Sequence, residues 1–198
     1  MKVDPKVIII TGASGSGKTF LLSHLKDNPN LGIKAIKKYT SRSARCYEDK
    51  SDAVDLVFNQ NVEDVKKYLF YYPYKGEQYG IDAEQIDSEL IKGYHVAVIV
   101  RNFDTIKKIK EHYSNCYVLY LHSAKSSHDL ENVLKRQGRE QTVVNQSLSN
   151  RRNIFDDYIH TLYDNIVDFL VLNYYDESFL AQVFYFLRKV GIHDESFY

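Results

Sequence analysis

A glycine-rich segment near the N-terminus carries the clearest chemical pattern in the chain. Residues 12–19 form a complete G-x-x-x-x-G-K-[ST] motif between an expected strand and an expected helix. Its glycines let successive backbone N–H groups turn inward as a nest for anions, and the helix N-terminus adds partial positive charge. In such a nest Lys18 neutralises phosphate oxygens, and the Thr19 hydroxyl holds the Mg²⁺ that bridges them. The motif therefore predicts that ATP and Mg²⁺ bind to Gly12, Ala13, Ser14, Gly15, Ser16, Gly17, Lys18 and Thr19.

A basic segment follows the first expected helix. Residues 34–45 hold lysines and arginines but no acid, although the chain as a whole carries no net charge. Arg42 and Arg45 lie among hydroxyl side chains, and a guanidinium group can donate two parallel hydrogen bonds to one phosphate. The segment therefore favours a site for a phosphorylated acceptor, while a solvated basic face remains the alternative.

Expected strands and helices alternate along most of the chain. Extended segments are expected at 6–11, 70–74, 95–100, 116–122 and 169–172, and helices at 18–25, 83–92, 104–113 and 178–190. This alternation predicts an α/β fold with a parallel β-sheet covered by helices on both sides. Because no repeat or proline-rich linker interrupts the pattern, we expect one domain.

The amino-acid composition bears on which partners the protein binds and in which cell compartment it is expected. The 26 basic and 26 acidic residues cancel, so no overall field favours nucleic acid or a membrane as partner. Two cysteines are too few for a disulfide framework, and the apolar N-terminal run is too short for a signal peptide. We therefore expect a cytoplasmic protein. The histidines and cysteines show no spacing typical of metal ligands.

The motifs resemble those of the guanylate kinase family, in which a T-T-R-x-P-R segment binds the phosphate of the acceptor. Arg42 and Arg45 match the two arginines of that segment, although Ala44 replaces the proline and Lys38 replaces an upstream serine. The sequence at 78–80 is similar to the family's Y-Y-G, whose second tyrosine also reaches the acceptor phosphate. The resemblance thus implies that the acceptor binds to Arg42, Arg45 and Tyr79.

The resemblance also implies a domain plan. It predicts a P-loop kinase fold over residues 1–198, with a small acceptor-binding subdomain at about 34–95 and a helical lid at about 134–155. Asn173 looks like the family's strand-end asparagine beside the adenine of ATP. In the lid, Val133 and Gln137 replace two family arginines, and neighbouring arginines are expected to substitute. We therefore predict nucleotide binding by Arg136 and catalytic contacts from Arg139 and Arg151, alongside Lys18 and Arg42, with Arg152 close by.

The positions that read the base depart from the family pattern. Guanylate kinases read guanine partly with an acid before Y-Y-G and with acids in a strand-end D-x-D. The corresponding positions here are Phe70, Ile99 and Arg101, so carboxylate partners for the guanine N–H groups are expected to be missing. Nearby acids could substitute if the register differs: Asp55, Glu77 and Asp104.

Three functions therefore stay open at this stage. The favoured one is ATP-dependent phosphorylation of GMP or dGMP to GDP or dGDP. The second is a ribose 1,5-bisphosphate phosphokinase, a relative that also lacks these acids; Arg101, as an acceptor-binding residue, and the sequence at 138–140 resemble that branch. The third is a guanylate-kinase-like binding module without catalysis. The expected partner is a small phosphorylated acceptor, either a nucleoside monophosphate or a sugar phosphate, and the oligomeric state stays open.

Overall fold

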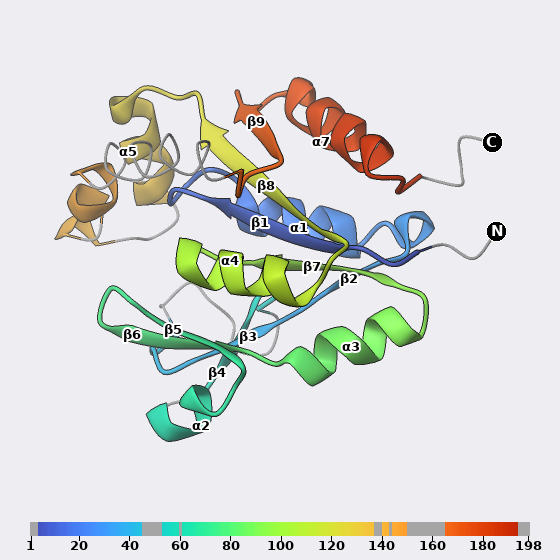
Figure 1. Ribbon diagram of the computed structural model, residues 1–198. Helices are drawn as coiled ribbons and strands as arrows, with labels where there is room; N and C mark the ends of the chain where they lie inside the picture. The colour runs from blue at the N-terminus through green and yellow to red at the C-terminus, as the bar shows by residue number, and fades with distance from the viewer. Residues whose placement is uncertain are drawn as a thin grey trace.

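Five parallel strands form the central sheet of the computed structural model (Figure 1). The structure describes residues 4–44, 53–59, 61–136, 140–142, 144–149 and 165–193. The strand order is β2 (Ile33–Ala35), β7 (His95–Ile99), β1 (Val7–Gly12), β8 (Cys116–Ser123) and β9 (Phe169–Asn173). β1 therefore lies in the middle of the sheet, and the glycine-rich loop leaves from its carboxyl end. The parallel sheet predicted from the sequence is confirmed.

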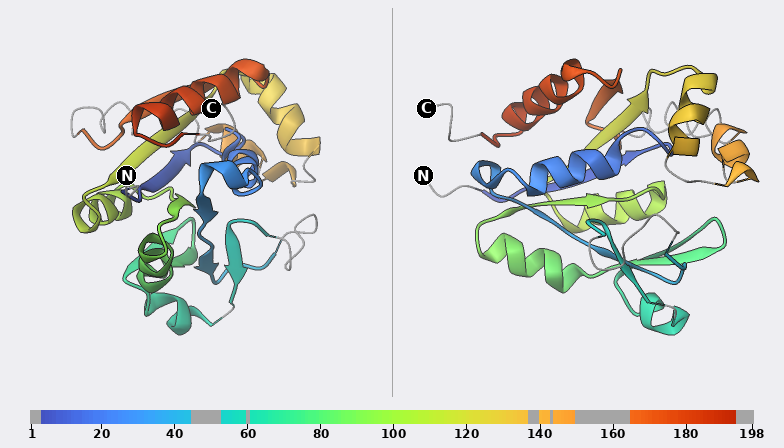
Figure 2. Two further views of the ribbon diagram at one scale, coloured as in Figure 1. Left: turned by 90° about the vertical axis from the view of Figure 1, so that its right-hand side faces the viewer. Right: turned by 180° about the vertical axis from the view of Figure 1, so that it is seen from behind.

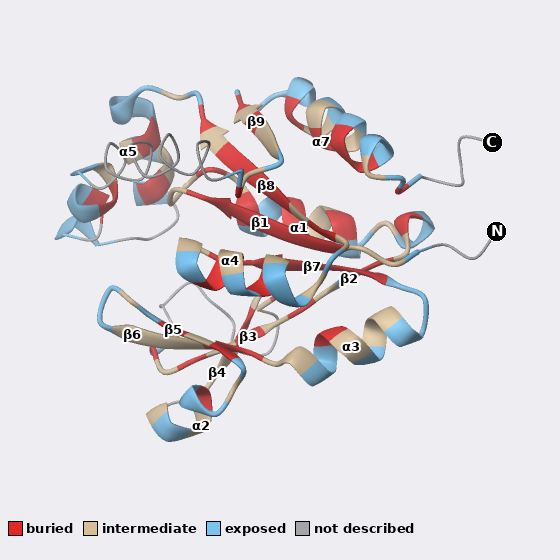
Figure 3. Cartoon of the chain, viewed as in Figure 1, coloured by how far each residue is buried: buried red, intermediate tan, exposed pale blue. Residues whose placement is uncertain are grey.

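Helices cover both faces of this sheet. Alternate residues of β1 point to opposite sides, so that Ile8 and Ile10 join one core cluster and Val7 and Ile9 join the other. The first cluster contains α1 (Lys18–Lys26) and α7 (Glu177–Lys189), and the second contains α3 (Ala83–Ile91) and α4 (Phe103–His112). Figure 3 shows the buried strands between these layers and the exposed outer faces of the helices. A strand buried on both faces explains the continuous apolar run in β1.

A second, four-stranded sheet forms a separate layer. Its order is β4 (Leu56–Phe58), β3 (Lys38–Thr40), β6 (Glu77–Ile81) and β5 (Phe70–Tyr74), and α2 (Val62–Lys66) packs against it. The strands β5 and β6 form a hairpin whose two-residue turn, Lys75-Gly76, has positive φ at both positions. The segment 70–74 was expected among the alternating strands of the α/β pattern, but it lies in this second sheet. Figure 2 shows the second sheet and α2 at the opposite end of the molecule from α7.

Further helical segments connect or follow these strands, including described residues 141–142 and 144–149. The 3₁₀ helix η1 (Pro29–Leu31) leads from α1 into β2, and α5 (Ser127–Arg136) follows β8. Leu130 and Leu134 of α5 pack with Val144 in a small apolar cluster of their own. Within the described ranges, none of the helices combines the length and the apolar character that crossing a membrane requires.

Candidate functional site

The glycine-rich loop needs glycine for both conformation and space. Gly12 and Gly17 have φ values of +133° and +95°, which L-residues with a side chain rarely adopt. A Cβ atom at Gly12 would lie 2.2 Å from the carbonyl oxygen of Leu121, and one at Gly17 would lie 2.6 Å from the Asn173 amide nitrogen. The close approach of β8 and β9 therefore fixes the loop at the end of β1.

The N-terminus of α1 opens toward the loop. Gly17 occupies its N-cap and supplies no side-chain cap, whereas Asp82, Asn102 and Asp176 cap α3, α4 and α7 with side-chain acceptors. The ammonium group of Lys18 is buried beside the loop, where it donates hydrogen bonds to the Ala13 carbonyl and, at 3.3 Å, to Ser16 Oγ. Positive charge thus collects at one point, as an anion site requires.

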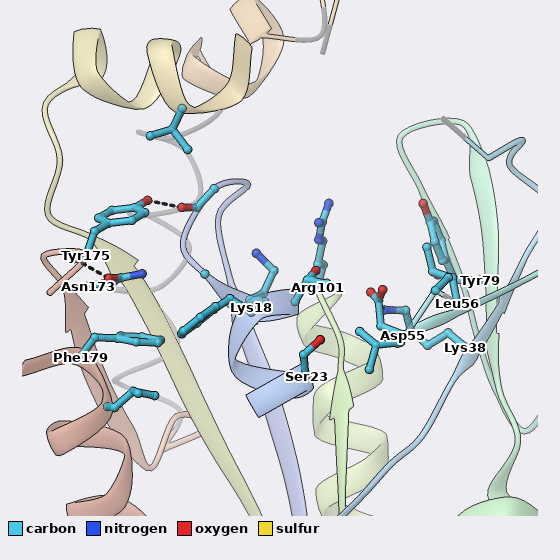
Figure 4. A pocket seen from close by; sticks show the side chains of 18 of the residues that line it. Lys18, Ser23, Lys38, Asp55, Leu56, Tyr79, Arg101, Asn173, Tyr175 and Phe179 are labelled. Atoms are coloured by element: carbon cyan, nitrogen blue, oxygen red, sulfur yellow. Dashed lines mark hydrogen bonds and ion pairs between the residues drawn. The ribbon is translucent and has the colours of Figure 1, made fainter. Parts of the chain in front are cut away.

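The end of β9 braces the loop from the other side. The Asn173 amide donates a hydrogen bond to the Ser16 carbonyl at 3.0 Å, and its Oδ1 accepts one from the Tyr175 backbone at 2.7 Å. The Tyr175 hydroxyl in turn donates to the Gly15 carbonyl (Figure 4). Asn173 therefore connects the loop to the central sheet.

A cavity of about 980 Å³ joins this loop to the second sheet (Figure 4). We call its two parts the P-loop half and the second-sheet half. The P-loop half is lined by Gly15, Gly17, Lys18, Thr19, Asn173 and Phe179. The second-sheet half is lined by Lys38, Arg42, Asp55, Tyr72, Tyr79 and Arg101. One cavity therefore connects the glycine-rich loop with the basic residues of the second sheet.

Cations and aromatic rings alternate in the second-sheet half. The Arg42 guanidinium lies 5.0 Å from the centre of the Phe58 ring and donates a hydrogen bond to the Ser43 carbonyl at 3.0 Å. Tyr79 on β6 stacks on its cross-strand partner Tyr72, with ring centres 5.4 Å apart. Arg101, just after β7, lies 5.6 Å from the centre of the Tyr74 ring. These contacts orient the two guanidinium groups toward the same space.

A buried ion pair forms part of the same wall. Lys38 Nζ lies 3.4 Å from Asp55 Oδ2, and the Lys38 backbone N–H donates to the Asp55 carbonyl at 3.0 Å. Burial lowers the pKa of Lys38 to about 8, while the Asp55 carboxylate acts in the opposite direction and Arg101 adds to the lowering. The ammonium form therefore still predominates at neutral pH.

The structure brings together most of the site residues expected from the sequence. Eight of them line the cavity: Gly15, Gly17, Lys18, Thr19, Arg42, Tyr79, Arg101 and Asn173. The remaining predicted loop residues belong to the same glycine-rich loop but do not line the cavity: Gly12, Ala13, Ser14 and Ser16. Arg136 is exposed at the end of α5, and it is Val133 of that helix that lines the cavity. The other predicted arginines lie outside the described residues: Arg45, Arg139, Arg151 and Arg152.

The expected base-reading positions need a correction. Phe70 is only 2% exposed and contacts the exposed ring of His112 on α4, and Ile99 is buried in the core cluster on the other face of the central sheet. Neither lines the cavity; on β5 the cavity is reached by Tyr72 and Tyr74. The physical reason is that residues 70, 72 and 74 share one face of the strand and pack into one core cluster, but only Tyr72 and Tyr74, nearer the hairpin turn, also border the cavity.

One of the three alternative acids reaches the cavity. Asp55 lines it, whereas Glu77 accepts a hydrogen bond from Ser41 Oγ at 3.2 Å and Asp104 is exposed at the start of α4. The second-sheet half therefore does contain a carboxylate.

Several lining residues were not singled out from the sequence. Tyr72, Tyr74, Tyr175 and Phe179 line the cavity. The period-two spacing of Tyr72 and Tyr74 shows that they share a strand face, but it does not show which space that face borders. Within the described residues no group of three or more His, Cys, Asp or Glu side chains could hold a metal. Cys116 is buried, and burial raises its pKa to about 12, whereas Cys46 lies outside these residues.

Comparisons with known proteins agree with this architecture. Residues 4–177 match the family model of guanylate kinase. The guanylate kinase of Prochlorococcus marinus subsp. pastoris is 27% identical over 153 residues, which cover 75% of this chain and 82% of that protein. The guanylate kinase of Mycoplasma mycoides subsp. mycoides SC is 32% identical over 96 residues, which cover 46% of this chain and 32% of the relative.

A solved structure shows the same fold. The crystal structure of guanylate kinase from Anaplasma phagocytophilum superposes with a TM-score of 0.67 over 97% of this chain and 89% of that one, at 14% identity. The match at 4–177 includes the glycine-rich loop, the second sheet and the residues that line the second-sheet half of the cavity. The chain therefore belongs to the guanylate kinase family, a family of nucleotide kinases.

Proposed function

We propose that the protein transfers the γ-phosphoryl group of ATP to a small phosphorylated acceptor, with GMP or dGMP as the first candidate and GDP or dGDP as the product. The observation that carries this proposal is the one cavity that joins Lys18 to Arg42, Tyr79 and Arg101. A nucleoside triphosphate bound near Lys18 and a phosphorylated acceptor bound near Arg42 would share this cavity. The low identity to the guanylate kinases leaves the choice of acceptor to experiment.

The P-loop half fits ATP and Mg²⁺ by its donor set. The glycine-rich loop and the uncapped N-terminus of α1 suit the phosphates, and Lys18 suits their β- and γ-oxygens. Thr19 lines the cavity with its hydroxyl available as a ligand for Mg²⁺. When bound, the ion neutralises charge that develops on the transferring group. Asn173 lines the same half and is proposed to lie next to the adenine.

The second-sheet half fits an anionic acceptor. Lys38, Arg42 and Arg101 outnumber the single acid Asp55 among the described charged residues that line it. Arg42 and Tyr79 are proposed to hold the phosphate that receives the γ-phosphoryl group. Catalysis then consists of positioning and charge stabilisation, with no covalent intermediate on the protein. Arg45, Arg136, Arg139 and Arg151 stay predicted contributors to the same charge stabilisation.

One observation supports a second candidate. Arg101 and Lys38 add two cations beyond Arg42, and a second phosphate on the acceptor would use them, as in ribose 1,5-bisphosphate. A third possibility is a binding module without catalysis. The complete Gly17-Lys18-Thr19 cradle argues against it, because binding alone does not need a lysine at the reacting phosphates.

A coupled assay of ATP consumption tests the proposal. The acceptors are GMP, dGMP, AMP, UMP, CMP and ribose 1,5-bisphosphate, with ATP alone as the blank. We expect turnover with at least one acceptor and a loss of about a hundredfold or more in Lys18→Ala. Lys34→Ala is the matched control, because Lys34 packs over Tyr94 outside the cavity. Silence with every acceptor, or full activity in Lys18→Ala, would refute the kinase mechanism.

A further inference from the structure

We propose that Lys38 and Asp55 together read the base of the acceptor, and that they select a base with a lactam edge, where a ring N–H adjoins a carbonyl oxygen. Guanine, hypoxanthine, uracil and thymine carry such an edge, and adenine and cytosine do not. This inference rests on the proposed kinase function, since it names the class of acceptor that the cavity takes.

The backbone holds the two side chains at a fixed separation. β3 and β4 run parallel, with Lys38 opposite Leu56, and the hydrogen bond from the Lys38 N–H to the Asp55 carbonyl joins the strands at this point. The side chains meet again at 3.4 Å between Nζ and Oδ2. In the view of Figure 4, both lie on the far side of Arg101 from Lys18. Tyr79 lies on the same side, so the pair is placed to contact the acceptor at a point away from Lys18.

Both side chains keep unused hydrogen-bonding capacity. An ammonium group has three N–H donors, and the one hydrogen bond of Lys38 Nζ within the described residues goes to Asp55. The carboxylate can accept several hydrogen bonds and receives this single one from a described side chain. Since both residues line the cavity, their remaining donors and acceptors are within reach of a ligand there.

The Tyr72 hydroxyl is a third polar group in the second-sheet half of the cavity that a ligand could pair with. Tyr72 is 3% exposed and lines the cavity, and its hydroxyl has no hydrogen-bond partner in the described part of the chain. Buried polar groups in proteins are nearly always paired, so a polar ligand is the natural partner of this hydroxyl. The stacked rings of Tyr72 and Tyr79 add an aromatic surface against which a planar base can pack.

The polarity of the pair decides which bases fit. The Lys38 ammonium donates and the Asp55 carboxylate accepts, so the matching edge must present an acceptor next to a donor in that order. A carbonyl beside a ring N–H does so. Adenine and cytosine present an amino donor beside an unprotonated ring nitrogen. In the orientation that a lactam base takes, this edge would place donor against donor and lone pair against carboxylate. Such mismatched buried polar groups give strong discrimination.

The test compares acceptors and removes the pair in steps. The variants are Asp55→Asn, Lys38→Met and the double variant Lys38→Met/Asp55→Leu. We expect the wild type to show a kcat/KM for GMP and IMP about a hundredfold or more above that for AMP, and UMP to exceed CMP. Each single variant should lower the ratio of kcat/KM for GMP to kcat/KM for AMP by about tenfold or more. The double variant should show no preference for GMP over AMP.

A matched control separates base reading from simple neutralisation of a buried lysine. Lys66 and Glu63 form an ion pair at 2.8 Å on the exposed surface of α2, so Lys66→Met/Glu63→Leu removes a pair outside the cavity and should leave the ratio unchanged. Circular dichroism and thermal unfolding check that the variants fold; replacing both members of a buried pair is usually tolerated. A double variant that folds and keeps the wild-type ratio would overturn the inference.

Binding measurements keep the inference distinct from the kinase proposal. If no acceptor is phosphorylated, that proposal fails, and calorimetry with GMP, IMP and AMP still decides the inference. Tighter binding of GMP and IMP supports it, while equal binding, or no binding of any of them, overturns it. Turnover confined to ribose 1,5-bisphosphate, with no preference among nucleotides, would uphold the kinase but refute base reading by Lys38 and Asp55.

Discussion

At the scale of single residues, Arg42 and Lys18 are held in place by different parts of the fold. Arg42 as a whole is only 9% exposed, and its guanidinium packs over Phe58. Its backbone N–H donates a hydrogen bond to Thr40 Oγ1 at 3.3 Å. These contacts come from β3, β4 and the loop after β3, all within the second sheet. Lys18, by contrast, is fixed by the glycine-rich loop. The two cations are therefore positioned by different parts of the fold.

This separation gives a prediction for Arg42→Ala. We expect the KM for the acceptor to rise and kcat to fall, with a combined loss in kcat/KM of about ten- to a hundredfold, because a charge-assisted hydrogen bond to phosphate is lost. Arg42→Lys should give an intermediate loss, since it keeps the charge but not the planar fork. Titration with an ATP analogue measures nucleotide affinity separately. If Arg42→Ala instead lost affinity for the ATP analogue and kept the acceptor KM, Arg42 would bind ATP and not the acceptor.

At the scale of elements, β6 and α2 approach so closely that only glycine fits between them. A Cβ atom at Gly80 would lie 2.6 Å from the Val65 carbonyl oxygen of α2 and 2.7 Å from a Tyr68 ring carbon. Gly80 follows Tyr79 directly, and Tyr68 stacks on Tyr39 of β3 with ring centres 4.3 Å apart. The packing of α2 therefore affects the strand that carries Tyr79 into the cavity.

We predict that Gly80→Ala moves α2 away from β6. The overpacking should lower the free energy of unfolding by about 1–3 kcal/mol, as measured by urea denaturation. The acceptor KM should rise while nucleotide affinity changes little, because the glycine-rich loop belongs to the other sheet. Gly76→Asn is the control: no atom lies within 4 Å of a Cβ at Gly76, and asparagine tolerates its positive φ. Equal effects of the two substitutions would rule out the steric explanation.

At the scale of the whole molecule, a buried histidine lies at the start of one strand of the central sheet. His95 opens β7 and is 5% exposed, and its Nδ1 accepts a hydrogen bond from the Lys6 backbone N–H at 3.0 Å. Burial, and then the nearby Lys6 charge, lower the pKa of His95 below its usual value of 6.5. Just below pH 6.5 the imidazole is therefore neutral in the folded protein more often than in the unfolded chain.

The sign of the pH dependence follows from that shift. The stabilisation by neutral His95 is complete above pH 6.5 and is lost as the pH falls from 6.5 toward the lowered pKa of the folded state. We expect the Tm to drop between pH 7 and pH 5 more steeply in the wild type than in His95→Gln, which does not titrate. Differential scanning fluorimetry at constant ionic strength measures both slopes. Parallel slopes would show that His95 does not contribute to the acid sensitivity.

The sequence by itself determined the features that depend on neighbouring residues. The glycine-rich loop is recognisable because its conformation is set by a contiguous run of residues, and helices expected at 18–25 and 83–92 appear as Lys18–Lys26 and Ala83–Ile91. Their periodicity and stop signals are local properties. The three-residue strands β2, β3 and β4 are too short for a period and form through pairing with other strands.

Only the tertiary structure decided which side chains share the cavity. Alternation shows that Phe70, Tyr72 and Tyr74 lie on one face of β5, but the hairpin register and the packing of Phe70 against α4 determine which of them reach the cavity. The same holds for Asp55, which meets Lys38 because β3 and β4 pair in parallel although they are distant in sequence. Contacts between residues distant in sequence depend on the pairing of strands, and a single sequence does not encode that pairing as a local pattern.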